Sequence, residues 1–261
     1  MQSMDDKNRR LDTIQDMLQK QNVVTIREFA KNLGTSEMTV RRDLQILKDQ
    51  GVVNIFYGGV SLRSASSVPR PGAYDIEQEL GEKAPQKMSI ARKAASLIMP
   101  NDVLLIDTGS TTSSIIDYIP CESRNIVYCY ALNIIQGVCA MPNLSVVACG
   151  GFFHRNTRMF ESEEGASLIR KTKINKAFMA TRGVTAEVGV TTAESYEIEM
   201  KKAAMSVSEQ KILLADSSKM GKAWYARYAR LEDFDIVITD SDVENRYADM
   251  IRDMGIELFI V

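Results

Sequence analysis

The sequence predicts a small N-terminal winged helix-turn-helix followed by a larger α/β domain with a largely parallel sheet. Residues 9–48 contain three short amphipathic stretches in close succession, and alternating apolar residues follow them. From about residue 87, helical stretches alternate with short apolar runs, which is typical of strands buried on both faces. With 261 residues, of which 45% are hydrophobic, the chain exceeds one typical domain and can bury a sizeable core.

The first two predicted helices lead into a short turn. Residues 9–20 are expected to form the first helix, with its apolar side chains facing inward: Leu11, Ile14 and Leu18. Residues 25–28 have the Thr-x-x-Glu pattern of a capping box, which opens the second helix. That helix should bury Phe29 and end at Gly34, leaving only a few residues before the next helix. This is the spacing of a helix-turn-helix.

The third predicted helix, residues 36–48, has a residue suited to each of its ends. Ser36 can accept hydrogen bonds from the backbone N–H groups of the first turn, and Gly51 suits a left-handed C-terminal cap. Apolar residues at i, i+4 and i+7 should form one buried stripe: Val40, Leu44 and Leu47.

The outer face of this helix mixes cations with hydrogen-bonding side chains. Arg forks bind guanine or phosphate, Gln binds adenine, and Thr reaches a phosphate or a thymine methyl group. The pattern therefore predicts a recognition helix for double-stranded DNA, with contacts from Ser36, Glu37, Thr39, Arg41, Arg42 and Gln45. An ordinary solvated helix face is the alternative that this helix alone leaves open.

Apolar residues alternate after Gly51 and continue beyond a pair of glycines, Gly58-Gly59: Val53, Ile55, Tyr57, Val60 and Leu62. This pattern predicts a small β-hairpin. Three helices followed by a hairpin make a winged helix.

Residues 36–44, Ser-Glu-Met-Thr-Val-Arg-Arg-Asp-Leu, together with Gly51 and Gly58-Gly59, resemble the DeoR family of bacterial transcriptional regulators. The Thr-Val-Arg-Arg-Asp-Leu run and the wing glycines occur at the family's spacing. The family usually has a basic residue in the first wing strand and a His before the paired glycines, where this chain has Asn54 and Tyr57. The resemblance therefore implies DNA contacts from the recognition helix, while the wing departs from the family's pattern at these two positions.

The charge is nearly balanced along the chain, with a net charge of −2. Residues 1–63 contain ten Lys or Arg and eight Asp or Glu, an excess of two positive charges, so the DNA footprint should be local and modest. The acidic remainder argues against a protein that coats DNA nonspecifically.

The cysteines indicate a reducing compartment. The chain has no C-x-x-C pairing, and its four cysteines lie in apolar or strand-like contexts: Cys121, Cys129, Cys139 and Cys149. They are expected to be buried thiols, with no metal site, cofactor or disulfide, as fits the cytoplasm. The charged start and the absence of an apolar run of about 20 residues predict neither a signal peptide nor a membrane span.

A segment rich in Ser, Pro and Gly, residues 63–72, predicts a linker between the domains. We expect a DNA-binding domain at 1–63, a linker at 64–83 and an α/β domain at 84–261. The expected strands of the α/β domain are residues 103–106, 126–129, 146–149, 177–180, 212–215, 236–239 and 258–261.

Ligands of such sheets bind beyond the carboxyl ends of the strands. Residues 107–112, Asp-Thr-Gly-Ser-Thr-Thr, offer glycine backbone, hydroxyls and the start of a helix, which together suit an anion, although such residues also make ordinary turns. The loop lacks the Gly-Lys-Ser/Thr ending of a nucleotide P-loop, which argues against ATP. Glu197 and Lys201, four residues apart on the helix expected after Gly189-Val-Thr-Thr, have the spacing of a surface ion pair.

These strand-end motifs are similar to those of the DeoR family's C-terminal sensor domain, which looks like a sugar-phosphate isomerase fold without its catalysis. The resemblance implies a phosphorylated sugar effector, with its phosphate near residues 109–112 and Lys219, and Asp107, Arg182 and Glu194 near its hydroxyls. The full set of expected effector-binding residues is Asp107, Gly109, Ser110, Thr111, Thr112, Gly150, Gly151, Arg182, Gly183, Glu194, Lys201 and Lys219.

Two functions remain open at the level of sequence. The favoured one is a repressor of a carbohydrate-metabolism operon, acting as a homodimer or homotetramer on operator DNA under control of the effector. The other is a sugar-phosphate isomerase-like enzyme with an accessory DNA-binding domain, in which Asp107, Glu194 and Lys201 would be the acid and base candidates. Under the favoured function the chain has no catalytic residues, and the single histidine, His154, is a structural or surface residue.

Overall fold

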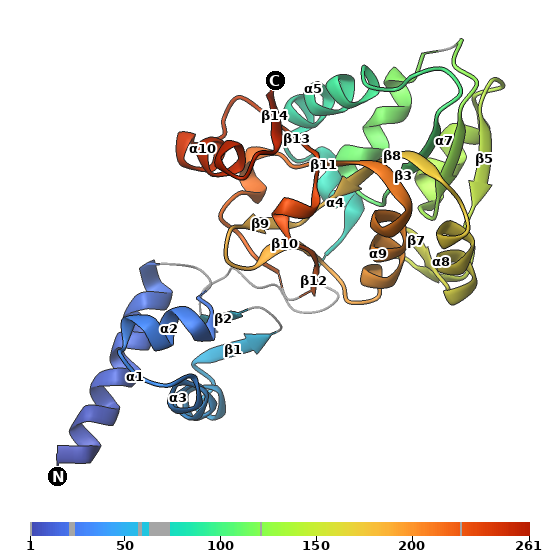
Figure 1. The fold of residues 1–261 in the computed structure, drawn as a ribbon. Helices are drawn as coiled ribbons and strands as arrows, with labels where there is room; N and C mark the ends of the chain where they lie inside the picture. The colour runs from blue at the N-terminus through green and yellow to red at the C-terminus, as the bar shows by residue number, and fades with distance from the viewer. Residues whose placement is uncertain (1, 21–23, 57–58, 63–73, 121, 225) are drawn as a thin grey trace.

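The N-terminal unit is built from three helices and a hairpin. The computed structural model describes residues 2–20, 24–56, 59–62, 74–120, 122–224 and 226–261 (Figure 1). The elements of the unit are α1 (Gln2–Lys20), α2 (Ile26–Asn32), α3 (Glu37–Asp49), β1 (Val53–Phe56) and β2 (Gly59–Leu62). β1 and β2 pair antiparallel, and Val24 bridges to Val60 beside them. The winged helix-turn-helix is therefore confirmed, while Tyr57 and Gly58 lie outside the described residues.

The helix ends follow the predicted capping. The Thr25 hydroxyl accepts from the Glu28 N–H at 3.2 Å, and the Glu28 carboxylate accepts from the Thr25 N–H at 2.8 Å. The Ser36 hydroxyl caps α3 by accepting from the Thr39 N–H at 3.2 Å, and Gly51 has a φ of +73°. α1 begins at Gln2, earlier than expected, because residues 2–8 contain no Gly or Pro to stop a helix.

The larger domain is organised around a seven-stranded sheet in the order β14-β13-β11-β8-β3-β4-β5, with every neighbouring pair parallel. Its strands are β3 (Val103–Ile106), β4 (Ile126–Cys129), β5 (Ser145–Ala148), β8 (Ile174–Ala180), β11 (Ser208–Leu214), β13 (Ile236–Thr239) and β14 (Glu257–Ile260). All seven expected strands are found, and the α/β fold class is confirmed. The edge strands β5 and β14 are partly exposed because each has only one neighbour.

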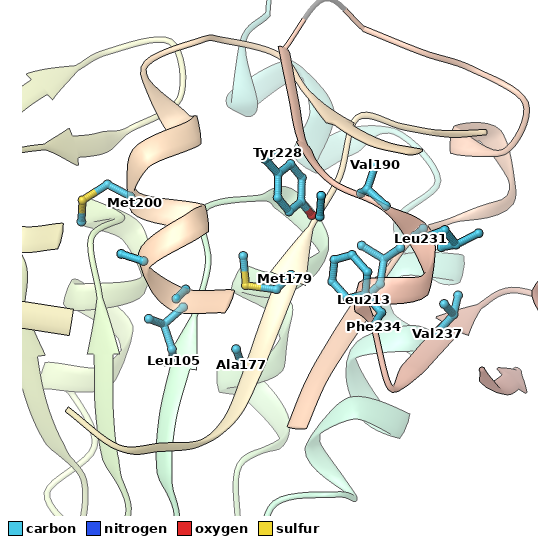
Figure 2. Close-up of a cluster of buried hydrophobic side chains, with 14 of the residues drawn as sticks. Leu105, Ala177, Met179, Val190, Met200, Leu213, Tyr228, Leu231, Phe234 and Val237 are labelled. Atoms are coloured by element: carbon cyan, nitrogen blue, oxygen red, sulfur yellow. The ribbon is translucent and has the colours of Figure 1, made fainter. Parts of the chain in front are cut away.

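Helices cover both faces of this sheet. One face packs on α5 (Ala84–Ala95) and α7 (Leu132–Cys139), and the other on α8 (Glu163–Arg170), α9 (Glu197–Val207) and α10 (Asn245–Asp253). Figure 2 shows part of the second core, with Met200 on α9 above Leu105, Met179 and Leu213 of neighbouring strands. Side chains of successive strand residues point to opposite faces, so each central strand contributes to both cores.

Short elements fill the ends of the sheet. They are α6 (Ser110–Ser113), η1 (Ser114–Tyr118), η2 (Ser217–Lys219) and η3 (Leu231–Asp233), the hairpin of β6 (Phe152–His154) and β7 (Met159–Glu161), and an antiparallel sheet of β12 (Ala226–Ala229), β10 (Gly189–Thr192) and β9 (Gly183–Thr185). Gly189-Val-Thr-Thr is thus itself a strand. Glu194, which the sequence suggests is on the helix after this run together with Glu197 and Lys201, lies before α9.

The predicted linker, 64–83, is not a linker throughout. Residues 63–73 lie outside the described residues, but α4 (Ile76–Gly81) follows them. Ile76 is fully buried, and its N–H donates to the Asn156 carbonyl at 2.9 Å. A helix this short shows no apolar periodicity in sequence, and tertiary packing stabilises it.

Two cysteines fit their predicted burial and one does not. Cys129 and Cys149 are buried free thiols, and burial raises their pKa to about 12 and about 11. Cys139 is exposed because it lies at the C-terminal end of α7, on the side away from the sheet. Cys121 lies outside the described residues.

Candidate functional site

The recognition helix α3 presents the predicted DNA-contacting side chains to solvent. All but one are exposed: Ser36, Glu37, Arg41, Arg42 and Gln45. Thr39 is half-buried because its hydroxyl and backbone N–H both meet the Ser36 hydroxyl, at 3.0 and 3.2 Å. The Gln45 amide donates to the Asp49 carboxylate at 2.8 Å, so it would have to leave that partner to reach a base.

A partly buried ion pair helps to hold α3 in its orientation. The Arg10 guanidinium of α1 donates to both carboxylate oxygens of Asp43, at 2.8 and 3.3 Å. Asp43 is only 3% exposed and belongs to the same helix as Arg41 and Arg42. Because a two-point contact resists rotation, this pair helps to fix which face of α3 meets solvent.

A polar pocket lies at the carboxyl ends of the three central strands β3, β8 and β11. Parallel α/β sheets bind ligands at this edge. The cavity itself has a volume of about 30 Å³, so lining side chains would have to move to admit anything larger than a few water molecules. Six predicted effector residues line it: Gly109, Ser110, Thr111, Arg182, Lys201 and Lys219.

The floor of the pocket is a buried network around Lys201, whose side chain is 1% exposed. Its ammonium group donates to the Asp107 carboxylate and to the Ala180 carbonyl at 3.2 Å, and it lies 3.5 Å from the Glu197 carboxylate. Asp107 also accepts from the Tyr130 hydroxyl and, at 2.8 Å, from the Ala180 N–H. The prediction that Glu197 and Lys201 form a surface pair is therefore wrong: the two residues do pair, but the face of α9 that carries them is turned toward the sheet.

The floor holds two carboxyl groups, Asp107 and Glu197, and one cation, Lys201. Burial raises the pKa of Glu197, and the ammonium group of Lys201 acts in the opposite direction. Burial also raises the pKa of Tyr130 and Tyr228, so both hydroxyls keep their protons as donors. Carboxylates and hydroxyls in this arrangement suit the hydroxyl groups of a ligand better than its anionic group.

The mouth of the pocket holds the cations. The Arg182 guanidinium pairs with the Glu79 carboxylate and lies between the Tyr74 and Trp224 rings, 5.1 and 4.8 Å from their centres. The Lys219 ammonium donates to Glu79 at 3.1 Å. Burial alone would raise the pKa of Glu79, but the hydrogen bond and charge of Arg182, together with Lys219, lower it to about 2.

The other six predicted effector residues lie around the pocket or away from it. Asp107 and Thr112 are buried next to the lining residues, and the Thr112 hydroxyl donates to the Gly109 carbonyl at 3.0 Å. Gly150 and Gly151 follow β5, which is two strands, or roughly 10 Å, from β3. Gly183 lies in β9, and Glu194 accepts from the Asn156 amide at 3.1 Å.

Close packing requires glycine at positions 109 and 151, as it does at Gly183, where a Cβ would lie 2.3 Å from the Lys222 carbonyl oxygen. A Cβ at Gly109 would lie 2.5 Å from the Ala180 Cβ, so only glycine lets the loop after β3 approach β8. A Cβ at Gly151, where φ is +151°, would lie 2.2 Å from the Glu161 carbonyl oxygen. Gly109 thus shapes the pocket, whereas Gly151 shapes the turn into the β6–β7 hairpin.

Several pocket residues are missing from the expected effector-binding set: Tyr74, Glu79, Thr181, Thr192 and Glu197. Thr192 was within reach of sequence reasoning because it ends the Gly-Val-Thr-Thr run; in the structure its hydroxyl donates to Glu197 at 2.6 Å. Tyr74 and Glu79 lie in the predicted linker, well before the first expected strand end of the α/β domain at residue 106. Among the residues that the structure describes, no cluster of potential metal ligands is found.

An exposed recognition helix on a winged unit, joined to an α/β domain with a polar pocket at its strand ends, defines a DNA-binding transcriptional regulator with a sensor domain. Family models match both parts of the chain: a DeoR-like helix-turn-helix domain at residues 10–66 and a DeoR C terminal sensor domain at residues 82–241. The chain belongs to the DeoR family, which confirms the resemblance seen in its motifs.

Named relatives match over nearly the full length. The chain is 30% identical to the deoxyribose operon repressor of Escherichia coli (strain K12), covering 97% of this chain and 98% of that protein. It is 29% identical to the transcriptional regulator IolR of Bacillus subtilis (strain 168), covering 91% and 93%. Among solved structures, ribose 5-phosphate isomerase from Plasmodium falciparum is similar at 15% identity and a TM-score of 0.38, over 51% of this chain and 52% of that one.

A further finding concerns membranes. Within the described ranges, none of the helices has the length and apolar character needed to cross a bilayer.

Replacing Lys201 with Met should lower the free energy of unfolding by about 3–5 kcal/mol, because two buried carboxylates lose their cation. The loss should be smaller in acid, since protonation of Glu197, whose pKa is already raised, removes one unpaired charge. Calorimetry over a range of pH measures both effects. Lys202→Met, at the exposed neighbouring position, is the matched control; equal losses in the two variants would contradict the buried network.

Proposed function

We propose that the chain is a cytoplasmic repressor of a carbohydrate-metabolism operon, and that a phosphorylated sugar bound in the pocket controls its affinity for operator DNA. The observation that carries this proposal is the uneven distribution of charged groups in the pocket. Cations outnumber carboxylates at the mouth, where Arg182 and Lys219 share Glu79, whereas carboxylates outnumber cations at the floor, where Asp107 and Glu197 share Lys201. A sugar phosphate is complementary to this arrangement, because it has an anion at one end and hydroxyls along the rest.

Each end of such a ligand would meet suitable groups. Arg182 and Lys219 can bind phosphate oxygens, with the hydroxyls of Ser110 and Thr111 as further donors on the β3 side. α6 is a single turn, so its dipole is small, and the cations supply most of the attraction. The Glu197 carboxylate can accept from sugar hydroxyls, and so can the Thr192 hydroxyl, whose own proton is donated to Glu197.

The relatives support a regulator of sugar metabolism. One of them is named for the deoxyribose operon that it represses. We extend this to the present chain as a proposal for the class of operon, and we propose that the chain has no catalytic activity. The isomerase alternative needs Glu194 near the ligand, but that carboxylate lies outside the pocket lining. Turnover of pentose or hexose phosphates by the purified protein would contradict the proposal.

Arg42→Ala should weaken operator binding, because Arg42 is an exposed cation on the outer face of α3. A bidentate base contact would make the loss about 1–3 kcal/mol and relax specificity at one position, whereas a phosphate contact would weaken binding to all sequences and reduce its salt dependence. Fluorescence anisotropy with operator and random duplexes measures both. Arg252→Ala, at an exposed position of α10, is the control. If the Arg42→Ala variant binds both duplexes as tightly as the wild type does, α3 is not the recognition helix.

Replacing Ser110 with Ala and Thr111 with Val should abolish the effect of a sugar phosphate on operator binding, because both remove hydroxyl donors from the pocket wall. Ligand-free DNA affinity should change little, since these residues belong to the α/β domain and α3 to the N-terminal unit. DNA titrations with and without a panel of sugar phosphates provide the measurement, with Ser113→Ala as the control. A fragment of residues 1–63 that responds to these compounds would contradict the two-domain scheme.

A single winged helix contacts little DNA, so a useful affinity requires at least two copies. We therefore propose a homodimer or homotetramer that binds repeated half-sites. Light scattering of the full chain should give at least twice the mass of one chain, which is 29.2 kDa. A monomer that binds a single half-site tightly would contradict this proposal.

A further inference from the structure

The phosphate-binding groups of the pocket already have an anionic partner from within the chain. Glu79 of α4 is 6% exposed, and its two carboxylate oxygens divide between Arg182 and Lys219. A third cation, Lys87, donates to the Glu79 backbone carbonyl and lies 3.9 Å from its carboxylate. The carboxylate thus occupies the place among the cations that a ligand phosphate would need.

We propose that Glu79 is an intramolecular competitor of the effector phosphate, and that binding of a phosphate monoester displaces Glu79 and loosens α4. This inference rests on the proposed function, and it adds the means by which the same pocket is regulated. It also explains why a short helix that follows the predicted linker forms part of the pocket wall.

The charges at the mouth favour this exchange. Arg182, Lys219 and Lys87 face two carboxylates, Glu79 and Asp216, which leaves one positive charge in excess. A phosphate monoester carries nearly two negative charges at neutral pH, so it would balance the cluster better than the single charge of Glu79 does. In addition, Nε of Arg182 is buried without an acceptor among the described residues, so another anion oxygen could accept from it.

The position of α4 gives the exchange a direct path to the DNA-binding unit. Tyr74, whose ring contacts Arg182, is the first described residue after the range 63–73, and Asp75 caps α4. Loosening of Glu79 therefore acts on the part of the sensor domain that is connected first to the N-terminal unit. A ligand deep in the pocket, with no contact to α3, can in this way change how the two parts of the chain are held.

Calorimetric titration of the full chain with inorganic phosphate tests the competition. Glu79→Gln keeps the shape of the side chain and removes its charge, so phosphate should bind about tenfold more tightly than to the wild type, a change typical of coupled sites. Glu77→Gln is the matched control, because Glu77 lies on the same helix but is exposed and pairs with Arg158. The control should keep the wild-type affinity.

Hydrogen exchange of the wild-type chain tests the displacement and does not depend on how the variant folds. Backbone amides of residues 76–82 should exchange several times faster when phosphate is bound, while those of α10 should not change. Phosphate binding with unchanged or slower exchange in α4, or with equal affinity in Glu79→Gln, would overturn the competition and leave the proposed function standing. Absence of phosphate binding by both proteins would overturn the proposed phosphate site and the competition together.

Discussion

The sensor domain depends on the buried contact of Lys201 with Asp107 and Glu197. Lys201 comes from α9, Asp107 from the end of β3, and Ala180, which bonds to both, from the end of β8. A buried charge is tolerated only when it is paired and hydrogen-bonded, so these three elements must keep their relative positions. The same contact fixes the loop of residues 107–112 at the edge where the pocket opens.

Around this floor, the pocket separates its charges by depth. Carboxylates, a lysine and tyrosine hydroxyls form the fully buried layer, and Arg182 and Lys219 form a second, more accessible layer. The aromatic rings of Tyr74 and Trp224 flank Arg182 and limit the directions in which it can move. Such a site can orient a ligand that has one anionic end, because that end is attracted by the cations of the accessible layer and repelled by the carboxylates of the buried layer.

The N-terminal unit and the α/β domain are stabilised by separate apolar cores. The unit is stabilised by one small apolar core and by the Arg10–Asp43 pair, which keeps the exposed side of α3 constant. The sensor domain has two cores, one on each face of its sheet, and the pocket lies at the strand ends. A change in the sensor must therefore reach the DNA through the position of whole elements rather than through side chains shared by both.

The sequence by itself determined the helices and hairpin of the N-terminal unit, the helix caps, the buried stripe of α3 and the seven strands of the main sheet, because each depends on residues close together in the chain. It also indicated the loops after β3, β8 and β11 as a ligand site, since parallel strands end at one edge. Only the tertiary structure decided that β5 lies too far away for Gly150 and Gly151 to reach the pocket, and that Glu197 and Lys201 are buried. It also brought Glu79, 103 residues before Arg182 in sequence, into contact with that arginine. Strand order and long-range ion pairs have no local pattern, so they are set by packing of the whole domain.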